Sequence, residues 1–524
     1  MDVAVGRPVA GRPRSPRRTV LVVAGAALAW SVGRAGIDGA IVNGGGQAAF
    51  GRFWTAVVDP ETGSTFLRLT LDAAAVTASY AILGTFASLL LAALVAPALS
   101  QLVAPAPLRL VARVLLVVPR SVHEILWALL AIQVLGFDPL VAVLAIAIPF
   151  GAVSAKVFAE TIDEADPGPY HTLRAAGARR FTALAYGVWP TISGELTSYA
   201  FYRLECGIRS AAVLGVIGAG GLGFQLDLSF ETLRYGEIWT LLAALVLLSG
   251  AADSWSAAVR RRPGPGVRRL SMAAFAVLVP LSWWWVELDP RTLWSARTRT
   301  LAVDLAADVW PPRLGLGGWG ELVSASIDTV AMSILALALA GGGGLLVAAT
   351  AARPHGRALR PGPGRRLAGI ATRFGLLVLR AVPAPVWAFL MVLVLFPGLW
   401  PGAVALGLYN LGVVGRLLAE AVEERDPGPA DALVLNGTPP LLRWCYATLP
   451  TAGPRMAAIV FYRWEVIVRE TVVVGVVGAG GLGQLINGHL AARDFAAVVG
   501  AVGAMVVIAL VIDGVSNQLR RRLR

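Results

Sequence analysis

Seven charged residues, Glu470 among them, lie inside two long apolar segments, where charge is costly. The segments read YAFYRLECGIRSAAVLG from Tyr199 and IVFYRWEVIVRETVVVG from Ile459. Each such charge costs about 2.5 to 3.5 kcal/mol near the centre of a membrane-spanning helix on insertion scales. Guanidinium groups bind phosphate-like oxyanions through a fork of N–H donors. These residues therefore predict a pathway for an oxyanion substrate, lined by Arg203, Glu205, Arg209, Arg463, Glu465 and Arg469.

The same spacing permits a structural role. Glu205 with Arg209, and Glu465 with Arg469, are i,i+4 pairs with the glutamate on the N-terminal side, which is the favourable order on a helix. In this alternative, two internal ion pairs orient the helices. The arginines two residues before each glutamate point elsewhere and stay unpaired.

A glycine-rich stretch follows each charged segment, GVIGAGGLG from Gly215 and GVVGAGGLG from Gly475. Both contain G-x-G-x-x-G, but a dinucleotide site also needs a preceding strand and an acidic residue about 20 positions on. Glu237 stands near that distance in the first copy, whereas Ala497 replaces it in the second. We instead predict a glycine hinge between packed helices or a wall of the pathway, formed by Gly218, Gly220, Gly221, Gly223, Gly478, Gly480, Gly481 and Gly483.

The composition is that of a polytopic membrane protein. The 524 residues are 56% hydrophobic and only 15% charged, with a mean hydropathy of +0.69. Soluble domains average about 25% charged residues. Twelve apolar runs, most long enough to span the bilayer, cover 19–32, 66–96, 108–135, 140–158, 198–217, 238–252, 270–286, 322–352, 367–396, 401–418, 456–477 and 495–512.

The net charge of +13 comes from arginines in the short connections between these runs. Basic clusters mark cytoplasmic loops, and in a twelve-span count starting inside they all fall on one side. We therefore expect a multi-pass protein of the cell membrane with cytoplasmic N- and C-termini, embedded in the lipid bilayer and binding no nucleic acid. The first run is expected to be an uncleaved span rather than a signal peptide.

The chain is a tandem repeat at an offset of 260 residues (478 − 218). FYRLE from Phe201 matches FYRWE from Phe461, and DPGP from Asp166 matches DPGP from Asp426. Upstream of Arg120 the register shifts, and Asp72 is expected to match Asp328. We predict an all-α membrane fold of two parallel six-helix repeats, with one unit in residues 1–262 and the other in residues 263–524.

A long polar loop between the fourth and fifth spans recurs in both halves. Each begins with acidic residues, breaks at Pro-Gly, continues as a short amphipathic segment and contains a glycine 13 residues before a proline. The positions that we expect to couple these loops to a partner are Glu160, Gly177, Pro190, Glu420, Gly437 and Pro450. No G-x-x-x-x-G-K-[ST] phosphate loop occurs in the sequence, so ATP must be used by another polypeptide.

These loops resemble those of ABC importer permeases, whose pattern is E-A-A, three residues, G, nine residues and I-x-L-P. DAL at Asp431 approximates its start, while HTL at His171 departs from it. Y-R-[LW]-E, the following arginine and the glycine stretch resemble the phosphonate and phosphate (PhnE-type) permeases. The resemblance implies a methionine-permease-like (MetI-like) fold, two ATPase subunits, an extracytoplasmic substrate-binding protein and a small phosphorus oxyanion as substrate.

Other function classes remain as alternatives. Permeases for methionine or glycine betaine share the glycine stretch and the loop pattern, and an ion-coupled secondary transporter can also use parallel repeats. An enzyme acting on lipid phosphates lacks support, because His123 and both cysteines have no repeat counterparts and no metal motif is present. We expect a transport subunit without enzymatic activity, cofactor or metal.

Overall fold

The computed structural model describes residues 16–36, 41–261, 264–353 and 362–523. Within these ranges the secondary structure is helical, apart from a single antiparallel bridge between Val42 and Leu395. The all-α prediction is therefore confirmed. The boundary predicted between residues 262 and 263 lies outside the described residues.

The long helices of the two halves alternate with short ones. Those of the first half are α1 (Pro16–Ala35), α3 (Ser64–Leu99), α7 (Pro139–Glu164), α10 (Trp189–Leu214) and α12 (Tyr235–Arg261). Those of the second half are α13 (Pro265–Trp285), α15 (Gly318–Ala351), α16 (Pro363–Ala381), α18 (Leu399–Glu423), α21 (Leu449–Val476) and α23 (Phe495–Leu523).

Six of the described helices are long and apolar enough to cross a membrane unbroken, and three bent helix pairs raise the number to nine. The other three predicted runs lie in α1, in α13 and in the broken segment formed by α4 (Ala106–Leu115), α5 (Val117–Ser121) and α6 (Glu124–Leu135). All twelve runs are thus helical, although not every run is one straight span.

The third predicted span of each half is interrupted. In the second half, α16 and α17 (Ala384–Val394) meet at a bend of 92°. Pro383 causes this break, because proline lacks an N–H donor and disfavours helical backbone at the preceding residue. In the first half His123 stands at this position, and its Nδ1 accepts a hydrogen bond from the Ile125 N–H at 3.3 Å.

The register of the first long helices differs from the sequence-based alignment. Thr77 of α3 accepts the Leu222 N–H at 2.9 Å, and Thr329 of α15 accepts the Leu482 N–H at 2.8 Å. These equivalent contacts set an offset of 252 (329 − 77), so the expected match of Asp72 with Asp328 is wrong. Asp328 instead forms an ion pair with Arg34 of α1 at 2.7 Å.

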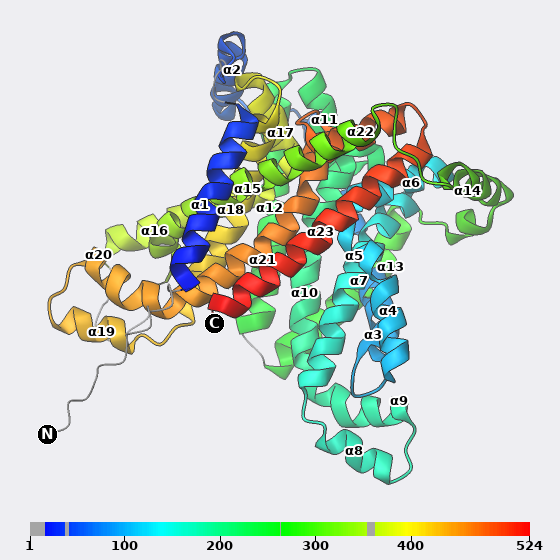
Figure 1. Cartoon of the computed structure of the whole chain (residues 1–524), viewed down its shortest axis with the longest axis vertical. Coiled ribbons are helices and arrows are strands. Elements are labelled where there is room, and N and C mark those ends of the chain that lie inside the picture. The colour runs from blue at the N-terminus through cyan, green and yellow to red at the C-terminus, as the bar shows by residue number, and fades with distance from the viewer. Residues whose placement is uncertain (1–15, 37–40, 262–263, 354–361, 524) are drawn as a thin grey trace, which may run out of the picture.

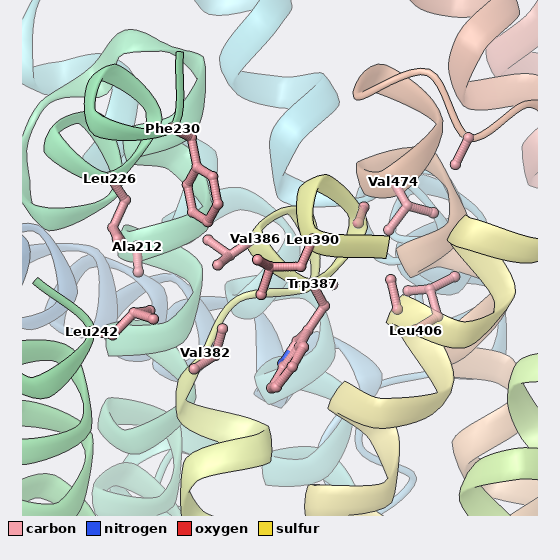
Figure 2. Packing of buried hydrophobic residues seen from close by; sticks show 14 of the residues in the cluster. Ala212, Leu226, Phe230, Leu242, Val382, Val386, Trp387, Leu390, Leu406 and Val474 are labelled. Atoms are coloured by element: carbon pink, nitrogen blue, oxygen red, sulfur yellow. The ribbon is translucent and has the colours of Figure 1, made fainter. Parts of the chain in front are cut away.

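The halves pack through two equivalent apolar interfaces. In one, Leu226 and Phe230 of α11 (Gly221–Glu231) face Val386 and Leu390 of α17 (Figure 2). In the other, Ile486 of α22 (Gly481–Ala491) belongs to a cluster with residues of α5–α6 and α23, namely Val122, Ile125, Leu126, Val498 and Met505. The reciprocal contacts are those of a pseudo-twofold interface.

The short helices gather at the two ends of the bundle. Helices α8 (Gly168–Ala175) and α9 (Arg180–Ala183) lie at the bottom of Figure 1, and α19 (Gly428–Leu435) and α20 (Pro440–Arg443) at its left, both away from α11 and α22. Helices α2 (Gln47–Thr55), α11 and α22 lie toward the upper end, and α14 (Ala296–Val309) projects to one side. The two polar loops of the repeat therefore face the same end of the molecule.

Candidate functional site

A central cavity of about 420 Å³ lies between the two halves. Its first-half wall comes mainly from α7 and α10, and its second-half wall from α16, α18 and α21. Five of the six charged residues predicted from the sequence line it: Arg203, Glu205, Arg209, Arg463 and Arg469. Glu465 lines a neighbouring pocket instead.

Glu205 is the acidic centre of an ion cluster that joins the halves. Its Oε1 lies 3.0 Å from Arg416 Nη1, 3.8 Å from Arg380 Nη1 and 3.9 Å from Arg209 Nη2. Asp253 of α12 accepts from Arg380 Nη2 at 2.8 Å and also pairs with Arg416. Two arginines of the second half are thus held by two acids of the first, while the predicted pair of Glu205 with Arg209 is present but long.

The corresponding pair in the second half does not form. Glu465 binds Arg520 of α23 at 3.0 Å, and Arg469 Nε donates to the Glu465 backbone carbonyl at 3.1 Å. The prediction of a Glu465–Arg469 ion pair is therefore wrong, because a nearer cation on the neighbouring helix takes the carboxylate. Arg463 is paired after all, with Glu470 Oε1 at 2.7 Å.

A smaller pocket of about 150 Å³ lies beside the central cavity, between α5, α7, α21 and α23. Its charged lining residues are Arg120, Lys156, Glu160, Glu465, Arg469 and Asp513. At the repeat offset they correspond to Arg380, Arg416, Glu420, Glu205, Arg209 and Asp253. The two places are the same charged corner built twice, once with arginine and once with lysine on the fourth span.

Arginine and lysine behave differently at that corner. Arg416 donates to Glu420 at 2.9 Å and reaches the acids of the other half, and its side chain is 20% exposed. Lys156 is 51% exposed and lies 3.7 Å from Glu160 of its own helix. The lysine therefore leaves an open pocket between the charged residues of its corner, whereas the arginine occupies the space between the acids of its corner.

The glycine stretches break the fifth helix of each half. Gly218, Gly220 and Gly221 have φ values of +93°, +90° and +76°, and the helices on either side are bent by 54°. A Cβ on Gly223 would lie 1.9 Å from the Ala212 carbonyl oxygen. Repeat equivalents of these glycines show the same features, with a bend of 45°. None of the eight predicted glycines lines the central cavity among the described residues, so the geometry favours a packing hinge over a pathway wall.

The repeated polar loops have matching local structure. Helix α8 ends with Gly177 at φ +88°, where Gly177 donates to the Arg174 carbonyl and Ala178 to the Leu173 carbonyl. Gly437 ends α19 with the same two bonds at φ +72°. This pair of bonds is a Schellman motif, which favours glycine because of the positive φ. Pro190 and Pro450 each lie two residues after a π-helical segment, Leu184–Val188 and Trp444–Thr448, that runs directly into α10 or α21. A proline has no N–H for the regular helical hydrogen bond, and such π segments are local irregularities of a helix.

The loop glutamates differ more. Glu160 faces the open pocket beside Lys156, whereas Glu420 lines the central cavity beside Arg416. With Pro190 in α10 and Pro450 in α21, four of the six predicted loop positions lie on the long helices, and only Gly177 and Gly437 follow the short ones.

Comparison with known families decides what kind of protein this is. Residues 84–263 and 344–524 each match the family described as the binding-protein-dependent transport system inner membrane component. The two matches cover most of the chain. It belongs to this transport family.

Curated relatives of this transport component are named as permeases for phosphate, phosphite or phosphonate. The phosphate-import permease protein PhnE of Mycolicibacterium smegmatis is 28% identical, with 79% of this chain and 77% of the relative aligned. The phosphite transport system permease protein PtxC of Stutzerimonas stutzeri is 32% identical over 49% of this chain and 90% of its own length. The putative cryptic phosphonate transport system permease protein PhnE2 of Escherichia coli is 32% identical over 22% of this chain and 97% of its own length.

Several residues of the transport component were missed from the sequence. Arg416 lies in an apolar run, and the repeat offset that aligns it with the lone Lys156 was the signal that could have singled it out. On the loops, two exposed apolar pairs recur at the same offset, Phe181 with Leu441 and Tyr186 with Tyr446. Large apolar side chains repeated on an exposed polar loop indicate a contact surface.

Proposed function

We propose that the chain is the transmembrane subunit of an ATP-driven importer for phosphate, a phosphonate or a related phosphorus oxyanion. The observation that carries the proposal is the arginine-lined cavity between the two halves. Seven arginines line it: Arg203, Arg209, Arg260, Arg380, Arg416, Arg463 and Arg469. Among the described residues only four carboxylates do so, Glu124, Glu205, Glu420 and Glu470.

This excess of positive charge suits an anion that loses water on entering a confined site. Guanidinium groups replace the lost hydration with charge-assisted hydrogen bonds. The carboxylates hold most of the arginines in place and moderate the field, so that a conducted ion is released again. The names of the relatives, which refer to phosphate, phosphite and phosphonate, support the same substrate class for this chain.

Two separate ATPase subunits bind the two polar loops in this proposal. The loops face one end of the bundle, carry equivalent Schellman glycines and expose equivalent apolar side chains. One docking point per half suits a pair of ATPases. This end is the cytoplasmic face, and the C-terminal end of the chain lies near α20 and α21 in Figure 1, on the same side. Both termini are cytoplasmic in the proposal.

The opposite end of the bundle receives an extracytoplasmic substrate-binding protein. Its short helices include α2 and α14, which follow the first apolar run of each half and lie outside the cytoplasm in a twelve-span count that starts inside. Exposed tryptophans at this end include Trp54, Trp294 and Trp310. Such amphipathic side chains suit a protein contact as well as the membrane interface.

The test is uptake by reconstituted vesicles that hold the chain, its ATPase and its binding protein. Radiolabelled phosphate, phosphite and methylphosphonate should enter only with ATP, and vanadate should stop the uptake. Uptake that continues without ATP, and collapses when an uncoupler removes the ion gradient, would identify a secondary transporter instead.

A further inference from the structure

We propose that the oxyanion binds off the pseudo-twofold axis, on the first-half side of the cavity, with Arg203 as its principal ligand. The proposal rests on the function proposed above and names the place where that function is carried out. In place of a pathway lined equally by arginines of both halves, the proposal assigns the anion to one subsite in the first half.

Arg203 has no acidic partner. Its Nε donates to the Tyr199 hydroxyl at 2.9 Å, and its guanidinium lies 4.5 Å from the centroid of the Phe150 ring. No carboxylate lies within ion-pair distance of it in the part of the chain that the structure describes. The residue is only 9% exposed, so this positive charge is withdrawn from water without a counterion.

The repeat counterpart is neutralised. Arg463 donates through Nη2 to Glu470 Oε1 at 2.7 Å and through Nε to Asn410 Oδ1 at 2.5 Å. The difference between Arg203 and Arg463 comes from two pairs of repeat-equivalent positions that hold different residues in the two halves. Ser210 stands where the second half has Glu470, and Phe150 where it has Asn410.

The acid nearest to Ser210 is engaged elsewhere. Ser210 donates to Glu124 Oε1 at 2.6 Å, and the Glu124 carboxylate also lies 3.4 Å from His123 Nδ1. Neither contact reaches Arg203. The first half therefore keeps an acid in the cavity wall without using it to neutralise this arginine.

The other arginines of the cavity are occupied or exposed. Arg469 donates to the backbone carbonyls of Glu465 and Arg120, at 3.1 and 2.7 Å. Arg260 is exposed and donates to Ser256. Those remaining have carboxylates within 4 Å, namely Arg209, Arg380, Arg416 and Arg463.

The free fork fits one phosphoryl group. The terminal nitrogens of Arg203 carry N–H groups with no acceptor in the described chain. Two parallel N–H donors match two oxygens of a tetrahedral oxyanion. Stacking on Phe150 uses the flat face of the guanidinium and leaves its edge for the anion.

The test compares equivalent arginines in the complete complex, reconstituted with its ATPase and loaded binding protein. Arg203→Gln should lower the uptake of radiolabelled phosphate, phosphite or methylphosphonate at least about tenfold, the loss expected from a charged hydrogen bond. The matched comparison, Arg463→Gln with Glu470→Gln, removes the neutralised pair of the same cavity without changing net charge, and it should lower uptake clearly less than Arg203→Gln does. Arg203→Lys should give intermediate uptake, because the charge remains and the fork is lost.

Each variant is also measured for its amount in the membrane, its co-purification with the ATPase and its ATPase activity without substrate. The inference requires that Arg203→Gln keep all three. It is overturned if Arg203→Gln transports like wild type, if uptake falls only in proportion to chain abundance, or if the control pair loses as much uptake. Wild-type vesicles that take up none of the three anions would instead overturn the proposed function itself.

Discussion

The charged corner around Glu205 and its copy around Glu465 differ in one residue, which is Arg416 in the first and Lys156 in the second. An open pocket lies in the second corner. In the first, Arg416 fills the space between Glu205, Asp253 and Glu420. In the second, Lys156 turns toward Glu160 and leaves a pocket of about 150 Å³. A guanidinium binds several carboxylates at once, while an ammonium is a compact and strongly hydrated charge. The comparison shows how one cation choice closes one side of a pseudo-symmetric interface.

The largest effect is expected from removing the cation that closes the first corner. Arg416→Gln leaves Glu205, which is largely buried, without its 3.0 Å partner, and breaking a buried pair costs about 3 to 5 kcal/mol. Thermal unfolding of the detergent-solubilised chain should show this loss as a lower midpoint. The matched change Lys156→Gln should cost less than about 1 kcal/mol, since its pair is exposed. Equal losses from both variants would contradict the difference between the corners.

A smaller effect is expected where the halves are alike. Gly223→Ala and Gly483→Ala would place a Cβ 1.9 and 2.5 Å from the carbonyl oxygens of Ala212 and Val472. Overpacking of this kind typically costs about 1 to 3 kcal/mol. Both variants should destabilise the chain in the same thermal assay, whereas Gly488→Ala, with open space at its Cβ, should not. Stable variants at positions 223 and 483 would argue against close packing at the hinges.

The coupling loops should lose function more than stability. Gly177→Val and Gly437→Val force a branched side chain to positive φ, which costs about 1 to 2 kcal/mol locally. We expect weaker co-purification with the ATPase and lower transport, with the chain still in the membrane. Unchanged ATPase binding by both variants would show that these glycines do not shape the docking surface.

The smallest expected effect sharpens the comparison. Lys156→Arg gives the open corner the cation of the closed one, and the longer fork should reach Glu465 and Asp513, which line the same pocket. The stability gain should be below about 1 kcal/mol, measured as the thermal midpoint at low and high salt. A gain that disappears in high salt would identify a screened ion pair, and no gain at any salt would leave the corner open.

Sequence patterns predicted the architecture well but the pairing of charges poorly. The helical class, the 260-residue repeat and the special backbone at Gly177 and Gly218 follow from hydropathy, identity and glycine placement. The partner of Glu465 did not, because i,i+4 spacing favours Arg469 while the fold brings Arg520 closer. The role of Arg416 was hidden for a similar reason, since two of its acidic partners, Glu205 and Asp253, lie on helices that meet α18 only in three dimensions.

Ser210 and Glu470 occupy equivalent positions of the two halves but differ in charge. This difference bears on how such a cavity can evolve. When two copies of one unit assemble, every codon change alters both walls at once, so an acid added beside one arginine is added beside the other. Joining the copies in a single gene removes that restriction. Arg463 can then keep its counterion while Arg203 stays free, and each wall of the cavity can be selected separately.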